Sequence, residues 1–115
     1  MSDCVFCKLI NRELPTTFIY EDEHVVSFSD ISPQAPVHVL IVPKLHIMAS
    51  VEEIHTENSA VVQKVFEAIP LIAKELGVSG NYRVISNCGE GAGQSVQHLH
   101  FHMLSGATTM RTRLL

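Results

Sequence analysis

Every second residue near one end of this 115-residue chain is a histidine, and this alternation constrains the fold more than any other feature. The histidines and the apolar residues after them are His98, Leu99, His100, Phe101, His102 and Met103. Successive side chains of a β-strand point to opposite faces, so the three imidazoles would share one face. On a helix, residues two apart are separated by about 200°, and the row is lost. The pattern therefore predicts a strand over residues 96–104. Its row of imidazoles either binds a metal or performs acid, base or nucleophile chemistry near neutral pH.

Length and charge limit the classes of protein that fit. A chain of this length forms one domain, and a dimer would help it to bury apolar surface. The net charge of -4 argues against nucleic acid as the main partner. No apolar run approaches the roughly 18 residues of a membrane span, and residues 1–4 do not resemble a signal peptide. Three cysteines do not suggest a disulfide framework, so we expect a reducing, cytoplasmic setting.

Apolar periodicity predicts the remaining elements. A short helix is expected over residues 4–11, with Asp3 as a candidate N-cap. Strands are expected over residues 16–20, 25–28, 37–42 and 82–86, with an acidic turn at residues 21–23. A long helix follows Thr56 or Asn58 and keeps its apolar spacing as far as Leu76. Pro70 should kink this helix or cut it in two, and Gly77 suits its C-terminal cap.

Two further segments accompany the histidine row. The strand over residues 37–42 is apolar except for His38, which shares a face with Leu40 and Val42. His38 joins the row if the two strands lie close together, and is otherwise a hydrogen-bonded core residue. Residues 87–95 contain three glycines, which allow backbone N–H groups to form an anion-binding nest. This segment is either such a nest or only a turn, but it leads directly into the histidines.

Nucleotidyl or phosphoryl transfer is the first hypothesis. A neutral imidazole is a good nucleophile toward phosphorus, and its other nitrogen must be held by an acceptor. The middle histidine, His100, is the natural nucleophile, while the glycine segment, Ser95 and the neighbouring imidazoles would hold the phosphate oxygens.

Two other hypotheses stay open. The first is metal binding, either by the histidine row or by Cys4 and Cys7, a C-x-x-C pair to which His46 and His98 are candidate additional ligands. The two thiols are equally compatible with a short helix that binds no metal. The second is a non-catalytic nucleotide-binding module.

The run from His98 to Leu104 resembles the H-φ-H-φ-H-φ-φ signature of the histidine-triad (HIT) superfamily, where φ is an apolar residue. Asn87, residues 93–96 and residues 30–38 resemble its nucleotide-binding branch, and residues 4–10 resemble the start of its bacterial members. The resemblance implies an α+β fold, in which a five-stranded antiparallel sheet carries a long helix and a short N-terminal helix. It also implies a single domain over residues 1–115, with a core at about 4–106 and a tail at 107–115, and a homodimer that joins two sheets.

The resemblance also implies residue roles. His100 attacks the α-phosphorus and forms a nucleotidyl-histidine, while His102 and His38 orient the phosphate and relay protons. Ser95 contacts the phosphate and the leaving group, Asp30 accepts from the ribose hydroxyls, and apolar residues wall the base. The implied nucleotide contacts are Phe6, Leu9, Phe28, Asp30, Ile31, Asn87, Gly93, Gln94, Ser95, Val96, His100 and His102.

The implied substrates are purine nucleoside 5′-phosphoramidates, which would release AMP or GMP. Cleavage of dinucleoside polyphosphates and a non-catalytic purine-nucleotide module are the alternatives. Zinc would be structural, held by Cys4, Cys7, His46 and His98, and the chemistry would need no metal. Two features depart from the family pattern. Residues 106–115 lack the tryptophan-containing tail of the phosphoramidase branch, and Cys88 stands where an acidic residue is more usual.

Overall fold

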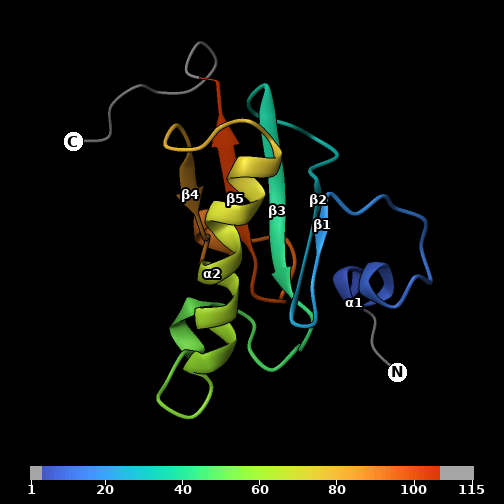
Figure 1. Ribbon diagram of the computed structural model, residues 1–115. Helices are drawn as coiled ribbons and strands as arrows, with labels where there is room; N and C mark the ends of the chain where they lie inside the picture. Colours follow the sequence, from blue (N-terminus) through green and yellow to red (C-terminus); the bar gives the residue numbers. More distant parts are fainter. Residues whose placement is uncertain (1–3, 107–115) are drawn as a thin grey trace.

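The computed structural model describes residues 4–106, which form five strands, two α-helices and two short 3-10 helices. The strands are β1 (Tyr20–Glu21), β2 (Val25–Ser29), β3 (Val37–Pro43), β4 (Arg83–Ile85) and β5 (Phe101–Ser105). The helices are α1 (Val5–Ile10), η1 (Val51–Glu53), α2 (Ser59–Glu75) and η2 (Glu90–Ala92). The strands pair antiparallel in the order β1-β2-β3-β5-β4, so the predicted α+β fold is confirmed (Figure 1). The homodimer stays a prediction.

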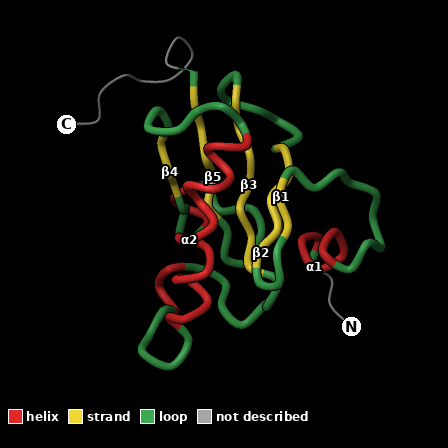
Figure 2. The backbone as a smooth tube through the Cα atoms, in the orientation of Figure 1, coloured by secondary structure: helices red, strands yellow, loops and turns green. Residues whose placement is uncertain are grey.

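The central strand β3 divides the core into two layers. Val39 and Ile41 point to the face covered by α2, where they join the larger apolar cluster. Leu40 and Val42 point to the opposite face and pack with Phe6 of α1. Figure 2 shows α2 lying across the sheet and α1 standing beyond the β1–β2 end. The sheet is therefore buried on both faces at β3, as its apolar run predicts.

Helix α2 is continuous through Pro70, so the expectation that this proline cuts the helix in two was wrong. Pro70 lies on the exposed side of α2. Because proline has no N–H, one carbonyl group of the preceding turn lacks its helical donor, and on this side it can accept from water instead. Asn58 is the N-cap, but its side chain accepts from His55 N–H and not from the first turn. Gly77 follows the last helical turn with φ +73°, the conformation that favours glycine at this position.

Two elements of the N-terminal region, the cap of α1 and the first strand, differ from the predictions. Cys4, and not Asp3, is the N-cap of α1, and its sulfur accepts from Cys7 N–H at 3.4 Å; Asp3 lies outside the described residues. The strand expected over residues 16–20 contains only Tyr20 and extends to Glu21. Ile19 N–H still donates to Ser27 O of β2, whereas Thr16 lies at the edge of a cavity described below.

The histidine segment is a strand only in its second half, since β5 begins at Phe101 and not at residue 96. Leu99 N–H donates to Met48 O at 3.1 Å, and His100 O accepts from the Ser86 hydroxyl at 2.8 Å. These partners lie in loops, so the backbone of residues 98–100 leaves the sheet ladder. The alternation nevertheless holds, because Leu99, Phe101 and Met103 all join the core under α2. In the described part of the chain, no helix has the length and apolarity that a bilayer span needs.

Candidate active site and metal site

A cavity of about 390 Å³ opens on the face of the sheet opposite α2. Its walls come from α1, from the loop after α1, from β2 and β3, and from the segment that leads into β5. The lining residues are Val5, Phe6, Leu9, Leu14, Pro15, Thr16, Phe28, Ser29, Asp30, Ile31, Leu40, Ser95, Val96, His100 and His102. One end is thus apolar and the other carries the imidazoles, an arrangement that suits a ligand with one apolar and one anionic part.

His100 presents one nitrogen to this cavity. Its Nδ1–H donates to His98 O at 2.8 Å, so the lone pair lies on Nε2. The side chain is only 6% exposed, and burial lowers the pKa of His100 below its ordinary value, so the ring is neutral at pH 7. A neutral imidazole with a fixed tautomer is the form that a nucleophile needs.

His102 and His38 form a hydrogen-bonded pair beside His100. His38 lies on β3 and His102 on β5, diagonal to each other across the antiparallel ladder, and His38 Nε2 is 2.9 Å from His102 Nδ1. Gln34 N–H donates to His38 Nδ1, so the His38 proton lies on Nε2 and points at His102. His102 in turn carries its own proton on Nε2. Burial, then the neighbouring His100 and His38, lower the pKa of His102 to about 4.

Asp30 lies beside this pair as well as at the cavity wall. Its Oδ2 is 3.5 Å from His38 Nε2 and 3.9 Å from His102 Nδ1. Its Oδ1 accepts from Ser32 N–H at 2.8 Å, which fixes the carboxylate. The carboxylate therefore opposes the loss of basicity that burial imposes on His102.

The glycine segment is organised by Gln94, which is 4% exposed. Its Oε1 accepts from Gly89 N–H at 2.8 Å, and its Nε2 donates to Ala49 O at 2.6 Å and to Val96 O at 2.9 Å. The whole amide is thus bonded to backbone groups. Gln94 shapes the loop that presents Ser95, and its side chain faces away from the cavity.

Most of the predicted nucleotide contacts line the cavity, but three do not. Asn87, Gly93 and Gln94 are not among the residues that line the cavity, and neither is His38. Leu14, Pro15 and Thr16 line it without having been predicted, because no local pattern shows that the loop after α1 folds back over the sheet. Leu40 was not predicted to line the cavity, although it shares a strand face with His38 and could have been found on that basis.

A second cavity of about 390 Å³ is bordered by His24, Lys44 and Val61, at the far end of β2. His24 is exposed, and none of the residues around this cavity belongs to the histidine row. The chemistry therefore points to the first cavity.

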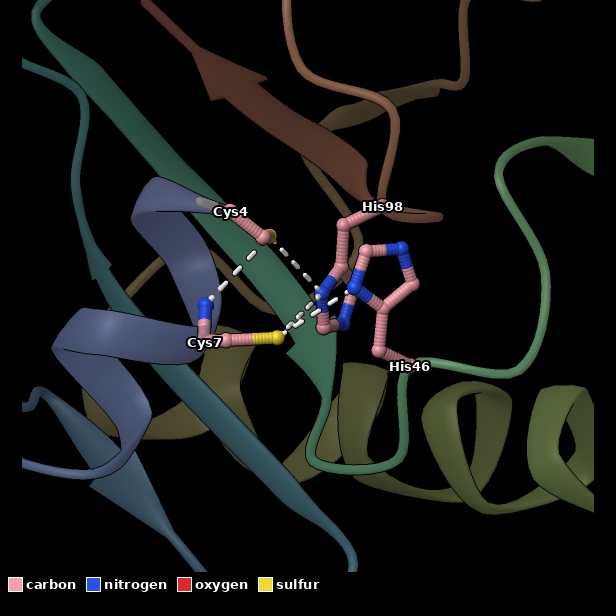
Figure 3. Close-up of side chains that lie close together, drawn as sticks. All are labelled: Cys4, Cys7, His46 and His98. Atoms are coloured by element: carbon pink, nitrogen blue, oxygen red, sulfur yellow. Dashed lines mark hydrogen bonds between the residues drawn. The ribbon is translucent and has the colours of Figure 1, made fainter. Parts of the chain in front are cut away.

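The four predicted metal ligands come together beside α1 (Figure 3). Cys4, Cys7, His46 and His98 each offer one ligand atom, and these atoms lie within 4.8 Å of one another. His98 Nδ1 is 3.4 Å from Cys4 Sγ and 3.6 Å from Cys7 Sγ, and His46 Nδ1 is 3.2 Å from Cys7 Sγ. Tetrahedral zinc with its usual bond lengths separates sulfur and nitrogen ligands by about 3.6 Å.

The hydrogen bonds of both imidazoles fit a metal site. His98 Nε2–H donates to Pro43 O at 2.9 Å, and His46 Nε2–H donates to Gln97 O at 2.8 Å. Each Nδ1 therefore turns a lone pair toward the sulfurs. His98 is fully buried, and burial lowers its pKa to about 4, which keeps the ring neutral. Two sulfurs and two neutral nitrogens are a donor set that zinc prefers.

The chain is similar to known proteins both in sequence and in structure. The sequence profile of the family described as "Scavenger mRNA decapping enzyme C-term binding" matches residues 3–114. The chain is 36% identical to the purine nucleoside phosphoramidase of Escherichia coli K12 over 105 residues, covering 90% of this chain and 87% of the relative. It is 42% identical to the 14 kDa zinc-binding protein of Zea mays over 109 residues, covering 91% and 83%.

Among solved structures, a HIT family hydrolase from Clostridium thermocellum superimposes with a TM-score of 0.91 at 49% sequence identity. The superposition covers 100% of this chain and 99% of that one. The similarity thus extends over the whole length of both chains.

Proposed function

Because this chain belongs to the histidine-triad superfamily, we propose that it is a nucleotide hydrolase whose substrates are purine nucleoside 5′-phosphoramidates. The observation that carries the proposal is His100, a neutral imidazole with Nδ1–H bonded to His98 O and Nε2 left to attack in the cavity. The relative in E. coli, a purine nucleoside phosphoramidase, supports the choice of substrate class.

In the proposed complex, the base lies among Phe6, Leu9, Phe28 and Ile31, and the ribose lies near Asp30. The phosphate then lies between the imidazoles and Ser95. The Nε2–H of His102 donates to a phosphate oxygen, and His38 holds His102 in that orientation. Asn87 supports the same site through the glycine segment.

The proposed reaction has two steps. First, the His100 Nε2 lone pair forms a bond to the α-phosphorus while the bond from phosphorus to the amine breaks. The departing amine takes one proton, which enters through the hydroxyl of Ser95 at the exposed mouth of the cavity. Second, water attacks phosphorus, the bond to His100 breaks, and the proton of the water is released.

We further propose that Cys4, Cys7, His46 and His98 hold a structural zinc ion, which would fix the local fold and take no part in these steps. The maize zinc-binding relative supports this assignment. We also propose a cytoplasmic homodimer. Dinucleoside polyphosphates are a second candidate substrate class, since attack at the α-phosphorus is the same.

Intact-protein mass spectrometry after brief mixing with an AMP–amine conjugate tests the proposal, with a quench that avoids acid because phosphorus–nitrogen bonds are acid-labile. We expect an adduct of one AMP on the wild type and on His55→Ala, an exposed control. We expect no adduct on His100→Ala, with AMP binding retained. If the wild type forms no adduct and releases no AMP, the chain does not cleave phosphoramidates.

A further inference from the structure

Helix α1 contributes to both the metal cluster and the cavity. Cys4 and Cys7 lie at its start and supply the two sulfurs. Val5, Phe6 and Leu9 come from the same two turns and line the apolar end of the cavity. The six helical residues and their N-cap thus carry half of a metal site and part of the wall around a base.

Apart from the Cys/His cluster, the helix is attached to the sheet by the apolar packing of Phe6, Leu9 and Ile10. It pairs with no strand and stands apart from α2 (Figure 1). Phe6 is its only buried residue. The chain after the helix is held by Arg12, which bonds to Glu21 at 3.0 Å, but that ion pair is exposed and such pairs stabilise little. Leu9 and Ile10 add partly buried packing, but a helix of six residues is marginal by itself, so a further attachment would fix its position.

The Cys/His cluster supplies that attachment. His46 follows β3 and His98 precedes β5, and the Nε2–H of each is anchored to a backbone carbonyl. Joining them to Cys4 and Cys7 fastens α1 to the middle of the sheet (Figure 3).

Phe6 connects this attachment to the reacting centre. It lies between the two cysteines in sequence, and its ring centroid is 5.9 Å from that of His98 and 4.9 Å from that of His100. The same ring is 5.7 Å from Phe28 on the opposite wall. A displacement of α1 therefore removes the ring that packs against His100.

We propose that metal occupancy of the Cys4–Cys7–His46–His98 cluster controls the affinity of the cavity for nucleotides by docking α1. This inference rests on the proposed function, because it takes the cavity as the nucleotide site. The metal cluster then controls nucleotide affinity from a position away from the phosphate, in addition to stabilising the fold.

The test compares AMP binding by isothermal titration calorimetry in zinc-loaded and chelator-treated protein. If α1 is docked in about a tenth of the metal-free molecules, the apparent Kd rises on the order of tenfold. Returning zinc should restore the Kd of the wild type. His46→Ala removes a ligand that is exposed and absent from the cavity wall, so it should mimic the metal-free protein even with zinc present. His24→Ala, another exposed histidine, is the matched control.

Hydrogen exchange gives a readout that does not depend on nucleotide. In the metal-free protein, the amides of Lys8 and Asn11, which bond to Cys4 O and Cys7 O, should exchange faster. The amides of β3 and β5 should be unchanged.

Equal AMP affinity in the zinc-loaded and metal-free forms overturns the inference. Hydrogen exchange in α1 that is the same with and without zinc also overturns it. Faster exchange throughout β3 and β5 also overturns it, because zinc would then support the whole fold and not α1 alone. If AMP binds neither form, the proposed function fails and the inference fails with it. That result is distinct from equal binding.

Discussion

Acidification should unfold this protein partly through His102. In the folded state its pKa is about 4, against an ordinary value of 6.5 for a solvated histidine. Between these values the unfolded chain binds a proton that the folded chain does not, so the free energy of unfolding falls as pH falls. The stabilisation is present above pH 6.5 and is lost as pH drops toward 4.

The magnitude follows from the two pKa values. A group with these values loses about 2 kcal/mol of stabilisation between pH 7 and pH 5. His102 lies with 18% of its side chain exposed, so solvent screening removes little of this effect. His98 shows a shift of the same size and adds a similar loss in metal-free protein.

Urea denaturation in chelator at pH 7, 6 and 5 measures the effect. His102→Asn should lower the pH-dependent loss by about 2 kcal/mol relative to the wild type, because the His98 contribution cancels between the two proteins. The exposed control His55→Asn should keep the wild-type slope. If His102→Asn also keeps that slope, the imidazole is not held neutral by its surroundings and the reasoning fails.

Four substitutions test the packing. Gly106→Ala places a Cβ 2.5 Å from Pro36 Cγ at φ +108°, and should destabilise by about 4 kcal/mol in urea melts. Gly77→Ala has a positive φ but no atom within 4 Å, so a loss of only about 1 kcal/mol is expected, and equal losses would contradict the clash. Ser27→Ala removes a fully buried hydroxyl without a hydrogen-bond partner among residues 4–106 and should stabilise by about 1 kcal/mol; destabilisation would reveal a hidden partner. Gln94→Met leaves three backbone groups without their hydrogen-bond partner and should lower the free energy of unfolding by about 3 kcal/mol. Turnover should also fall, because the loop that presents Ser95 loosens. An unchanged kcat would show that Gln94 does not position this loop for the reaction.

The sequence predicted the faces of the histidine segment better than its backbone. Alternation depends only on a locally extended chain, so Leu99 and His100 were placed on opposite sides correctly. The start of β5 depends on hydrogen-bond partners near Met48 and Ser86, which are distant in sequence and carry no local signal. The predicted limits of the strand were wrong for that reason, although the five strands and their antiparallel pairing agree with the predicted fold.

The metal cluster was predictable as a set, because the C-x-x-C spacing and the family resemblance named all four residues. Their geometry was not, since it depends on the carbonyls of Pro43 and Gln97 turning both imidazoles. The loop containing Leu14 and Thr16 was missed as a cavity wall because long-range folding alone brings it there. That α2 continues through Pro70 was not predictable from the helix pattern, because the position of a proline relative to solvent decides whether a helix tolerates it.

The departure of residues 98–100 from the sheet ladder has a consequence for engineering. His38 and His102 are carried by paired strands, whereas α1, the loop after it and the glycine segment lie outside the sheet. If the proposed function holds, the apolar end of the cavity can therefore be changed separately from the imidazole pair on the sheet. Exchanging residues 4–18 with the corresponding segment of a relative should alter which nucleotides bind while leaving His38 and His102 in place.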